Sequence, residues 1–440
     1  MRRKMTFVWL LLGLGSKLQV IASLSIAEIA VLLFAPLIFL KNYRQMKRDG
    51  VMTFFVLSLL VILGCIVGSI ANHTPREFVV RGLAVTVITS CAIVVSYWIL
   101  RNDPGGFKWY ILALPFSAIL STFVFRTAVE TATLGDSVQD IMSGPLFWIS
   151  RVRPFVMAPI QGWYLHMPIW LSAIVPLGVA VFSMLITTSG RSAALSAMAF
   201  AALVIIGGKR RRTISRISRH FGSICLIGVA LILLAYLMYK VSASKGWLGE
   251  ASRIKYEMQT RGGSGGIGRL LLGGRGDSFI GLLACRDKPI VGWGPWPTDQ
   301  NNYTEEFLER FGTEEDVLSL IENYDRRNQM KTRGRYGLSC HAYITEFWAW
   351  YGIFGLIFIL YATFVLIRFL RRDVAAIPQW HGWITCAIPG VFWAIFFSPY
   401  ANRVEFPMFI TACLMARAVR LGCFRLPLHM INEIENGERK

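Results

Sequence analysis

Three ionisable residues, far apart in the chain, have side chains that suit chemistry on a phosphate-bearing molecule. Arg191 opens one apolar stretch, Arg275 lies within Gly-Gly-Arg-Gly, and His341 stands where another apolar stretch begins. An arginine can hold a phosphate through two parallel hydrogen bonds, and a neutral imidazole can accept a proton near neutral pH. Simpler roles stay open, because arginines at helix ends often anchor at a membrane surface and helix-start histidines are often satisfied polar residues.

Nothing in the sequence indicates a metal or another cofactor. There is no C-x-x-C motif and no Cys/His spacing of the kind that holds a metal ion. The glycine-rich stretch 262–268 lacks the G-K-[ST] ending of a phosphate loop, so it resembles a linker or lid instead. Cys285 and Cys340 are the two cysteines expected outside the membrane, and a disulfide between them stays open.

The elements that must position these residues are membrane helices. Of the 440 residues, 54% are hydrophobic and only 16% are charged, with a mean hydropathy of +0.50. A soluble surface needs about 25% charged residues, so the composition excludes a soluble, disordered or disulfide-dense secreted protein. The net charge of +20 fits basic cytoplasmic loops better than a nucleic-acid surface. We therefore expect an all-α polytopic membrane protein that binds no nucleic acid.

Apolar runs long enough to cross a bilayer recur along the chain. They lie near 20–40, 51–71, 79–99, 107–125, 168–187, 192–207, 221–239, 343–370, 381–398 and 406–421, and a shorter run lies near 5–15. The runs 107–125 and 168–187 would both lead from the cytoplasmic to the outer side, so one more crossing must lie between them. Residues 145–165 must supply it. The sequence thus predicts about twelve transmembrane helices, with the start of the chain read as an anchor rather than a cleaved signal.

Basic clusters set the predicted orientation. They lie at 2–4, 41–48, 101–108, 209–219 and 368–372, and the positive-inside rule assigns such clusters to the cytoplasm. With 209–219 inside, Arg191, Arg275 and His341 all fall at the opposite, extracytoplasmic face. Both termini are expected inside.

This topology divides the chain into four parts. They are an N-terminal bundle of about nine helices (1–239), an extracytoplasmic helical block (240–342), C-terminal membrane helices (343–421) and a cytoplasmic tail (422–440). In the block, residues 240–288 carry nine Lys/Arg against four Asp/Glu, whereas 299–325 carry nine Asp/Glu against one arginine. These stretches either pair with one another or flank an anion site.

Three local sequences resemble the motifs of bacterial O-antigen ligases. Residues 187–195, Thr-Thr-Ser-Gly-Arg-Ser-Ala-Ala-Leu, resemble the family's T-x-S-R-x-x-x-L helix start. Arg275 followed by Lys-Pro-Ile-Val-Gly-Trp-Gly at 288–294 resembles R … P-L-x-G-x-G. His341-Ala-Tyr-Ile followed by Tyr-Gly-Ile-Phe-Gly at 351–355 resembles H-N-x-[FY]-L … G-x-x-G, with alanine in place of asparagine. The resemblance covers about 155–370.

The resemblance implies a GT-C-type glycosyltransferase of the O-antigen ligase/polymerase superfamily. Such an enzyme moves a glycan from undecaprenyl diphosphate to lipid A–core at the periplasmic face of the bacterial inner membrane, as part of lipopolysaccharide biosynthesis. By this resemblance Arg191 and Arg275 stabilise the leaving diphosphate and His341 is the general base of an inverting, metal-independent reaction. Further candidates for diphosphate or glycan binding are Arg153, Arg76, Arg81, Trp293 and Tyr343. We expect the protein to act as a monomer.

Other functions remain open within and outside the superfamily. Arg151 and Gly162 match an R-x10-G pattern described for O-antigen polymerases, and a protein O-oligosaccharyltransferase would differ only in its acceptor. A flippase for lipid-linked glycans would be expected to show internal repeats and midplane charges, which this sequence lacks. Glu346, one turn beyond His341, either orients that histidine or is buried against another polar group.

Overall fold

The structure is a computed structural model, and it describes most of the chain outside 126–275 and 312–341. The described residues are 2–16, 18–21, 24–125, 156–158, 168–186, 241–242, 245, 276–299, 301–311, 338, 340, 342–377, 380–398, 400 and 403–426. They form helices α1 (Arg2–Gly15), α2 (Ile26–Arg48), α3 (Met52–Ala71), α4 (Arg76–Asn102), α5 (Phe107–Phe125), α8 (Ile169–Ile186), α14 (Gly276–Asp287), α15 (Tyr303–Phe311), α18 (Tyr343–Arg368), α19 (His381–Phe397) and α20 (Glu405–Arg420). Short π-helical (Phe369–Asp373) and 3₁₀ (Val374–Ala376) turns follow α18, and β1 (Gln19–Ile21) pairs antiparallel with β2 (Leu24–Ser25).

The described chain is helical apart from this small ladder, as the sequence predicted. Four helices are long and apolar enough to cross a membrane: α2, α3, α4, and α18 with its π-helical extension. These helices make the chain a multi-pass membrane protein. The expected crossings at 192–207 and 221–239 lie outside the described residues, as does nearly all of 145–165. The count of twelve therefore stays a prediction.

One predicted boundary was wrong. The helix expected from residue 20 begins at Ile26, because β1 and β2 occupy residues 19–25. A capping box fixes this start: the Glu28 N–H donates to Ser25 Oγ at 3.2 Å, and Glu28 Oε2 accepts the Ser25 N–H at 2.8 Å. Reciprocal bonds of this kind satisfy two backbone donors that would otherwise be exposed in an apolar setting. Hydropathy alone does not distinguish a capped start from a longer apolar run.

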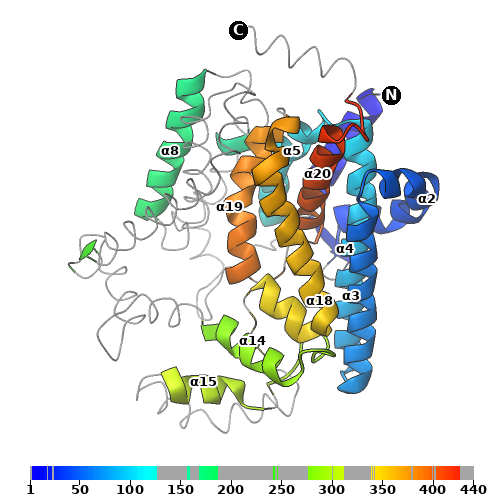
Figure 1. The fold of residues 1–440 in the computed structure, drawn as a ribbon. Helices are drawn as coiled ribbons and strands as arrows, with labels where there is room; N and C mark the ends of the chain where they lie inside the picture. Colours follow the sequence, from blue (N-terminus) through cyan, green and yellow to red (C-terminus); the bar gives the residue numbers. More distant parts are fainter. Residues whose placement is uncertain are drawn as a thin grey trace.

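Helix α4 lies at the centre of the bundle. It packs against α2, α3 and α20, while α18 lies along α3 (Figure 1). Gly64 of α3 allows the backbone of α18 to come close, since a Cβ there would lie 2.5 Å from the Tyr351 carbonyl oxygen. Further along the same two helices, the rings of Phe54 on α3 and Phe358 on α18 stack with their centroids 5.0 Å apart. The helix that follows His341 is therefore held firmly on α3.

The outer surface of α2 is apolar. Leu33, Phe34, Leu37 and Leu40 are each more than half exposed, on two successive turns. Contiguous exposed apolar area of this kind is uncommon on soluble monomers. A lipid environment accounts for it, in agreement with the membrane assignment.

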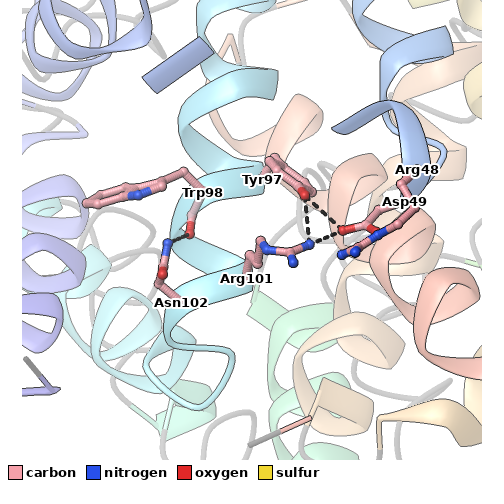
Figure 2. A network of polar contacts seen from close by, with 6 residues as sticks. All are labelled: Arg48, Asp49, Tyr97, Trp98, Arg101 and Asn102. Atoms are coloured by element: carbon pink, nitrogen blue, oxygen red, sulfur yellow. Dashed lines mark hydrogen bonds and ion pairs between the residues drawn. The ribbon is translucent and has the colours of Figure 1, made fainter. Parts of the chain in front are cut away.

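Three of the basic clusters, at 41–48, 101–108 and 368–372, lie at one end of the described bundle, here termed the basic end (Figure 1). Buried Asp49, in the turn between α2 and α3, accepts hydrogen bonds from Tyr97 at 2.8 Å and from Arg101, both on α4 (Figure 2). Arg48 donates to the other carboxylate oxygen at 3.1 Å. The Trp380 indole N–H donates to Pro104 O at 2.6 Å, which ties the α18–α19 connection to the same end. Three of the predicted cytoplasmic clusters thus share one end.

Helices α14 and α15 lie beyond the opposite end of α3 and α18 (Figure 1). Helix α14 packs on the first turns of α18, and α15 packs on α14. This end, here termed the motif end, holds the described parts of the second and third ligase-like motifs.

Candidate functional site

The motif end is built on a break in α18. Gly352 has φ +62° and ψ −146°, so the helix is interrupted there and its backbone turns. A positive φ is costly for residues with a Cβ. A Cβ on Gly352 would also overlap the Ile290 carbonyl group. This position therefore requires glycine on both counts.

The Lys288–Gly294 loop fills the break. The Trp293 N–H donates to Ala349 O at 2.6 Å, and the Gly294 N–H donates to Trp350 O at 3.1 Å. In the other direction, the Ile353 N–H donates to Ile290 O at 3.0 Å. A helix break leaves backbone groups without partners, and buried groups of this kind must be satisfied elsewhere. The loop supplies those partners.

Glycines in the loop permit the close approach. Gly292 and Gly294 have φ +76° and +79°, and a Cβ on Gly292 would lie 2.5 Å from Gly352 N. The two sequence motifs that contain Gly292 and Gly352 thus form one backbone junction, although they are 60 residues apart. We refer to residues 288–294 with 349–353 as the glycine junction.

The turn between α3 and α4 closes the glycine junction from the other side. The Asn72 amide donates to Gly68 O at 2.7 Å and to Gly292 O at 3.0 Å. The Lys288 ammonium group donates a hydrogen bond to Asn72 Oδ1, and Lys288 Nζ lies 3.8 Å from the Trp293 ring centroid. This arrangement combines a hydrogen bond and a cation–π contact. Lys288 thus brings a half-buried positive charge to the motif end.

The four residues expected to carry most of the chemistry lie outside the described residues: His341, Arg191, Arg275 and Arg153. Their chain neighbours are described in two cases. Helix α14 begins directly after Arg275, and α18 begins two residues after His341. The structure brings α14 and α18 together, because a Cβ on Gly281 would lie 3.1 Å from both Cys340 Sγ and the Thr345 side chain. The positions of the four side chains stay predictions.

We expected Arg76 and Arg81 in an outer loop, 72–81, after the apolar run 51–71, and this was wrong. Both belong to α4, whose first residue is Arg76, because Pro75 suits the residue that precedes a helix. Both side chains are exposed at the motif end. A Cβ on Gly82, next to Arg81, would lie 2.5 Å from the Pro295 side chain, just beyond the glycine junction. Their role as phosphate contacts stays a prediction.

Trp293 and Tyr343 are packed inside the protein. Trp293 is 6% exposed, donates its indole N–H to Ala284 O at 2.9 Å and meets Tyr303 edge to face. Tyr343 is 2% exposed and makes edge-to-face contacts with Tyr400 and Phe406. A sugar needs an open aromatic face for stacking, so we do not retain either ring as a glycan contact.

Glu346 connects α18 to the loop before α20. Its Oε2 accepts the Tyr400 N–H at 2.7 Å, and the carboxylate is buried. Of the two roles left open for Glu346, burial against another polar group is confirmed. Arg403 in the same loop pairs with Glu28 Oε1 at 3.5 Å. Sequence reasoning missed Arg403, although its place at the start of the last helix is readable from the hydropathy.

Helices α14 and α15 show one contact between the segregated charges. Arg286 lies 3.7 Å from Glu306. The basic and acidic stretches therefore pair at this point, which is one of the two arrangements that the sequence left open. Tyr303 donates a 2.6 Å hydrogen bond to Asp287. That bond, with a smaller contribution from Arg286, lowers the pKa of Asp287. Arg286 and Asp287 both lie at the surface, so the ion pair between them contributes little to stability.

Cys285 and Cys340 do not form a disulfide. Both thiols are buried, and burial raises the pKa of Cys285 to about 12. The pair therefore acts as small apolar packing between α14 and α18.

Within the described ranges no three His, Cys, Asp or Glu side chains are grouped so as to hold a metal ion. The expected independence from metals stays a prediction. Comparisons with known protein families, with characterised proteins and with solved structures find no match to this chain.

Proposed function

We propose that the protein is a membrane glycosyltransferase that moves an O-antigen glycan from undecaprenyl diphosphate to lipid A–core. The observation that carries the proposal is the glycine junction, where Gly292 and Gly352 bring two ligase-like motifs into backbone contact. Nothing in the spacing of these motifs requires them to meet. Their contact is what a shared site at the motif end needs.

In the proposed reaction, His341 takes the proton from the acceptor hydroxyl as its oxygen attacks the anomeric carbon. The bond from that carbon to the diphosphate oxygen breaks, and the electron pair leaves with the lipid diphosphate. Attack from the opposite face inverts the anomeric centre. Arg191 and Arg275 stabilise the departing charge, for which planar guanidinium groups are well suited. This chemistry needs no metal.

The described residues have positioning roles in this proposal. The glycine junction fixes the angle at which α18 leaves the bundle, and His341 precedes that helix by two residues. Asn72 and Lys288 connect the junction to the α3–α4 turn, which directly precedes Arg76 of α4. The basic end is then cytoplasmic and the motif end periplasmic, with the protein in the bacterial inner membrane.

Gene deletion and complementation in the native host tests the proposal. The surface glycans and the lipid-linked glycans are profiled together. A ligase predicts loss of long-chain lipopolysaccharide and accumulation of polymeric lipid-linked glycan. Retention of single repeats on the core would indicate a polymerase, and loss of glycan from proteins would indicate a protein O-oligosaccharyltransferase. Normal profiles for all three would refute the proposal.

A matched pair of variants separates chemistry from folding in this test. His341→Ala should fail to complement, whereas His73→Asn should complement fully. His73 lies exposed at the same end with φ +50°, a conformation that asparagine tolerates. Failure of both variants at normal protein level would argue against a specific role for His341.

A further inference from the structure

A cluster of arginines at the basic end surrounds one buried carboxylate. Asp373 ends the π-helical turn after α18 and is 1% exposed. Arg420 on α20 donates from Nε to Asp373 Oδ1, and Arg368 Nε lies 3.8 Å from Oδ2. We refer to Asp373 with Arg368, Arg417 and Arg420 as the Asp373 cluster.

Arg417 brings a third positive charge to the Asp373 cluster. Arg417 and Arg420 are three residues apart on α20, so they lie on the same face of that helix. Arg417 also acts electrostatically on Arg368, together with Asp373, Arg420 and Arg372, and Asp373 is the acid in this set. Three guanidinium groups and one carboxylate leave an excess of two positive charges. Arg371 and Arg372, both exposed, add to this field.

Two atoms in the cluster lack hydrogen-bond partners. Arg368 Nε and Arg417 Nε are buried, and neither has a hydrogen-bond partner among the described residues. The 3.8 Å from Arg368 Nε to Asp373 is too long for a hydrogen bond. A buried N–H of a charged group is unfavourable when it lacks a hydrogen-bond partner. An arrangement of this kind is expected where an anion completes the hydrogen bonding.

The Asp49 cluster at the same end shows the contrast. There, Asp49 accepts from Arg48, Arg101 and Tyr97 (Figure 2), and Arg101 also donates to Tyr97 Oη at 2.9 Å. The Arg101 guanidinium lies 5.2 Å from the Phe424 ring centroid. None of its side-chain atoms is among the buried groups without partners in the described chain. In the Asp49 cluster, one carboxylate and one tyrosine thus leave no buried donor without a hydrogen bond. In the Asp373 cluster, one carboxylate leaves Arg368 Nε and Arg417 Nε without one in the part of the chain described.

We infer that the Asp373 cluster binds a phosphate group. Arginines offer paired donors that match phosphate oxygens, and the buried Nε atoms of Arg368 and Arg417 have no hydrogen-bond partner among the described residues. The cluster lies where the α18 span ends, at the level of lipid head groups, and basic sites between helices on the cytoplasmic side bind anionic lipids. The phosphate source is either an anionic phospholipid or soluble phosphate. This inference does not depend on the proposed transferase activity.

Native mass spectrometry of the full-length protein tests the inference. The protein is exchanged into phosphatidylglycerol, phosphatidylcholine or phosphatidylcholine with inorganic phosphate, and retained ligand is measured. We expect retention of phosphatidylglycerol over phosphatidylcholine, and about tenfold weaker binding in Arg417→Gln, the effect of losing roughly 1.4 kcal/mol. Arg44→Gln removes an exposed charge from the same end and should bind as the native protein does.

Every outcome of this experiment is decisive. If phosphatidylglycerol is retained and inorganic phosphate does not displace it, the source of the phosphate group is a lipid. If inorganic phosphate displaces it, the source is soluble. Both results support a phosphate site. Arg417→Lys keeps the charge and should show intermediate binding, which guards against misfolding of Arg417→Gln. Equal losses in Arg417→Gln and Arg44→Gln would overturn the inference.

Discussion

His341 is the residue on which the proposed chemistry depends most. Replacement by alanine should lower glycan transfer by roughly 10²–10⁴, the usual range for loss of a positioned acid–base group. Protein level should stay normal, and His341→Gln should not rescue, because an amide cannot accept the proton. Transfer measured by lipopolysaccharide gel and by mass spectrometry checks this. Near-native transfer in His341→Gln would mean that the side chain only forms hydrogen bonds.

The two arginines of the proposed site should tolerate lysine only in part. A lysine keeps the positive charge but loses the planar pair of donors, so Arg191→Lys and Arg275→Lys should each fall between the native protein and the alanine variants. The measurement is the initial rate of transfer at saturating donor. Full activity in Arg275→Ala would remove it from the site, and Arg269 or Arg286 would then be the replacement candidate.

The two cysteines of the α14–α18 contact should be chemically inert. Cys285 is fully buried and its pKa of about 12 leaves the thiol protonated up to pH 9, so maleimide should not label it in the native protein. Cys340 should be protected by burial, whereas partly exposed Cys423 should react. Peptide mapping after labelling with and without denaturant checks this. A disulfide-linked 285–340 peptide would contradict the structure.

At the scale of elements, the glycine junction should be sensitive to a single methyl group. Gly352→Ala combines a left-handed conformation with overlap against Ile290, a cost of roughly 2–5 kcal/mol. Gly50→Ala has a similar φ of +78° but open space, so it isolates the conformational cost of about 1–2 kcal/mol. Gly178→Ala on α8 has neither penalty.

Thermal unfolding in detergent ranks these three variants. The melting temperature should fall most for Gly352→Ala, less for Gly50→Ala, and not at all for Gly178→Ala. Gly352→Ala should also lose transfer, because the loop from Lys288 must move. Equal melting temperatures for Gly352→Ala and Gly50→Ala would mean that the Lys288–Gly294 loop does not fill the break.

Hydropathy was enough to place α3, α4 and α18 within a few residues, because each needs a long apolar run. It placed α2 less well, since that helix begins and ends later than its apolar run. It could not show the break in α18, since Tyr-Gly-Ile-Phe-Gly is apolar and a single glycine within a helix is common. The break depends on Ile290 and Gly292, which are about 60 residues away. The burial of Trp293 against Ala284 and Tyr303 could not be predicted either, because it is a tertiary property. The helix break and the burial of Trp293 therefore depend on contacts between distant segments, which the local sequence pattern does not show.

At the scale of the whole molecule, orientation is the next prediction. Because basic residues collect at one end, residues 240–340 should be extracytoplasmic and 209–219 cytoplasmic. In cells with a permeabilised outer membrane, an impermeant maleimide should label Asn301→Cys and should miss Thr213→Cys. The reverse labelling pattern would place His341, Arg191 and Arg275 on the wrong side for a periplasmic donor.

The most direct test of the central proposal is transfer by the purified full-length protein. The protein is reconstituted in lipid nanodiscs with undecaprenyl-diphosphate-linked glycan and lipid A–core, with EDTA present. The account predicts glycan-bearing lipid A–core together with one released undecaprenyl diphosphate per transfer, in the native protein and not in His341→Ala. The absence of product from well-folded native protein with both substrates, or equal product from His341→Ala, would contradict it.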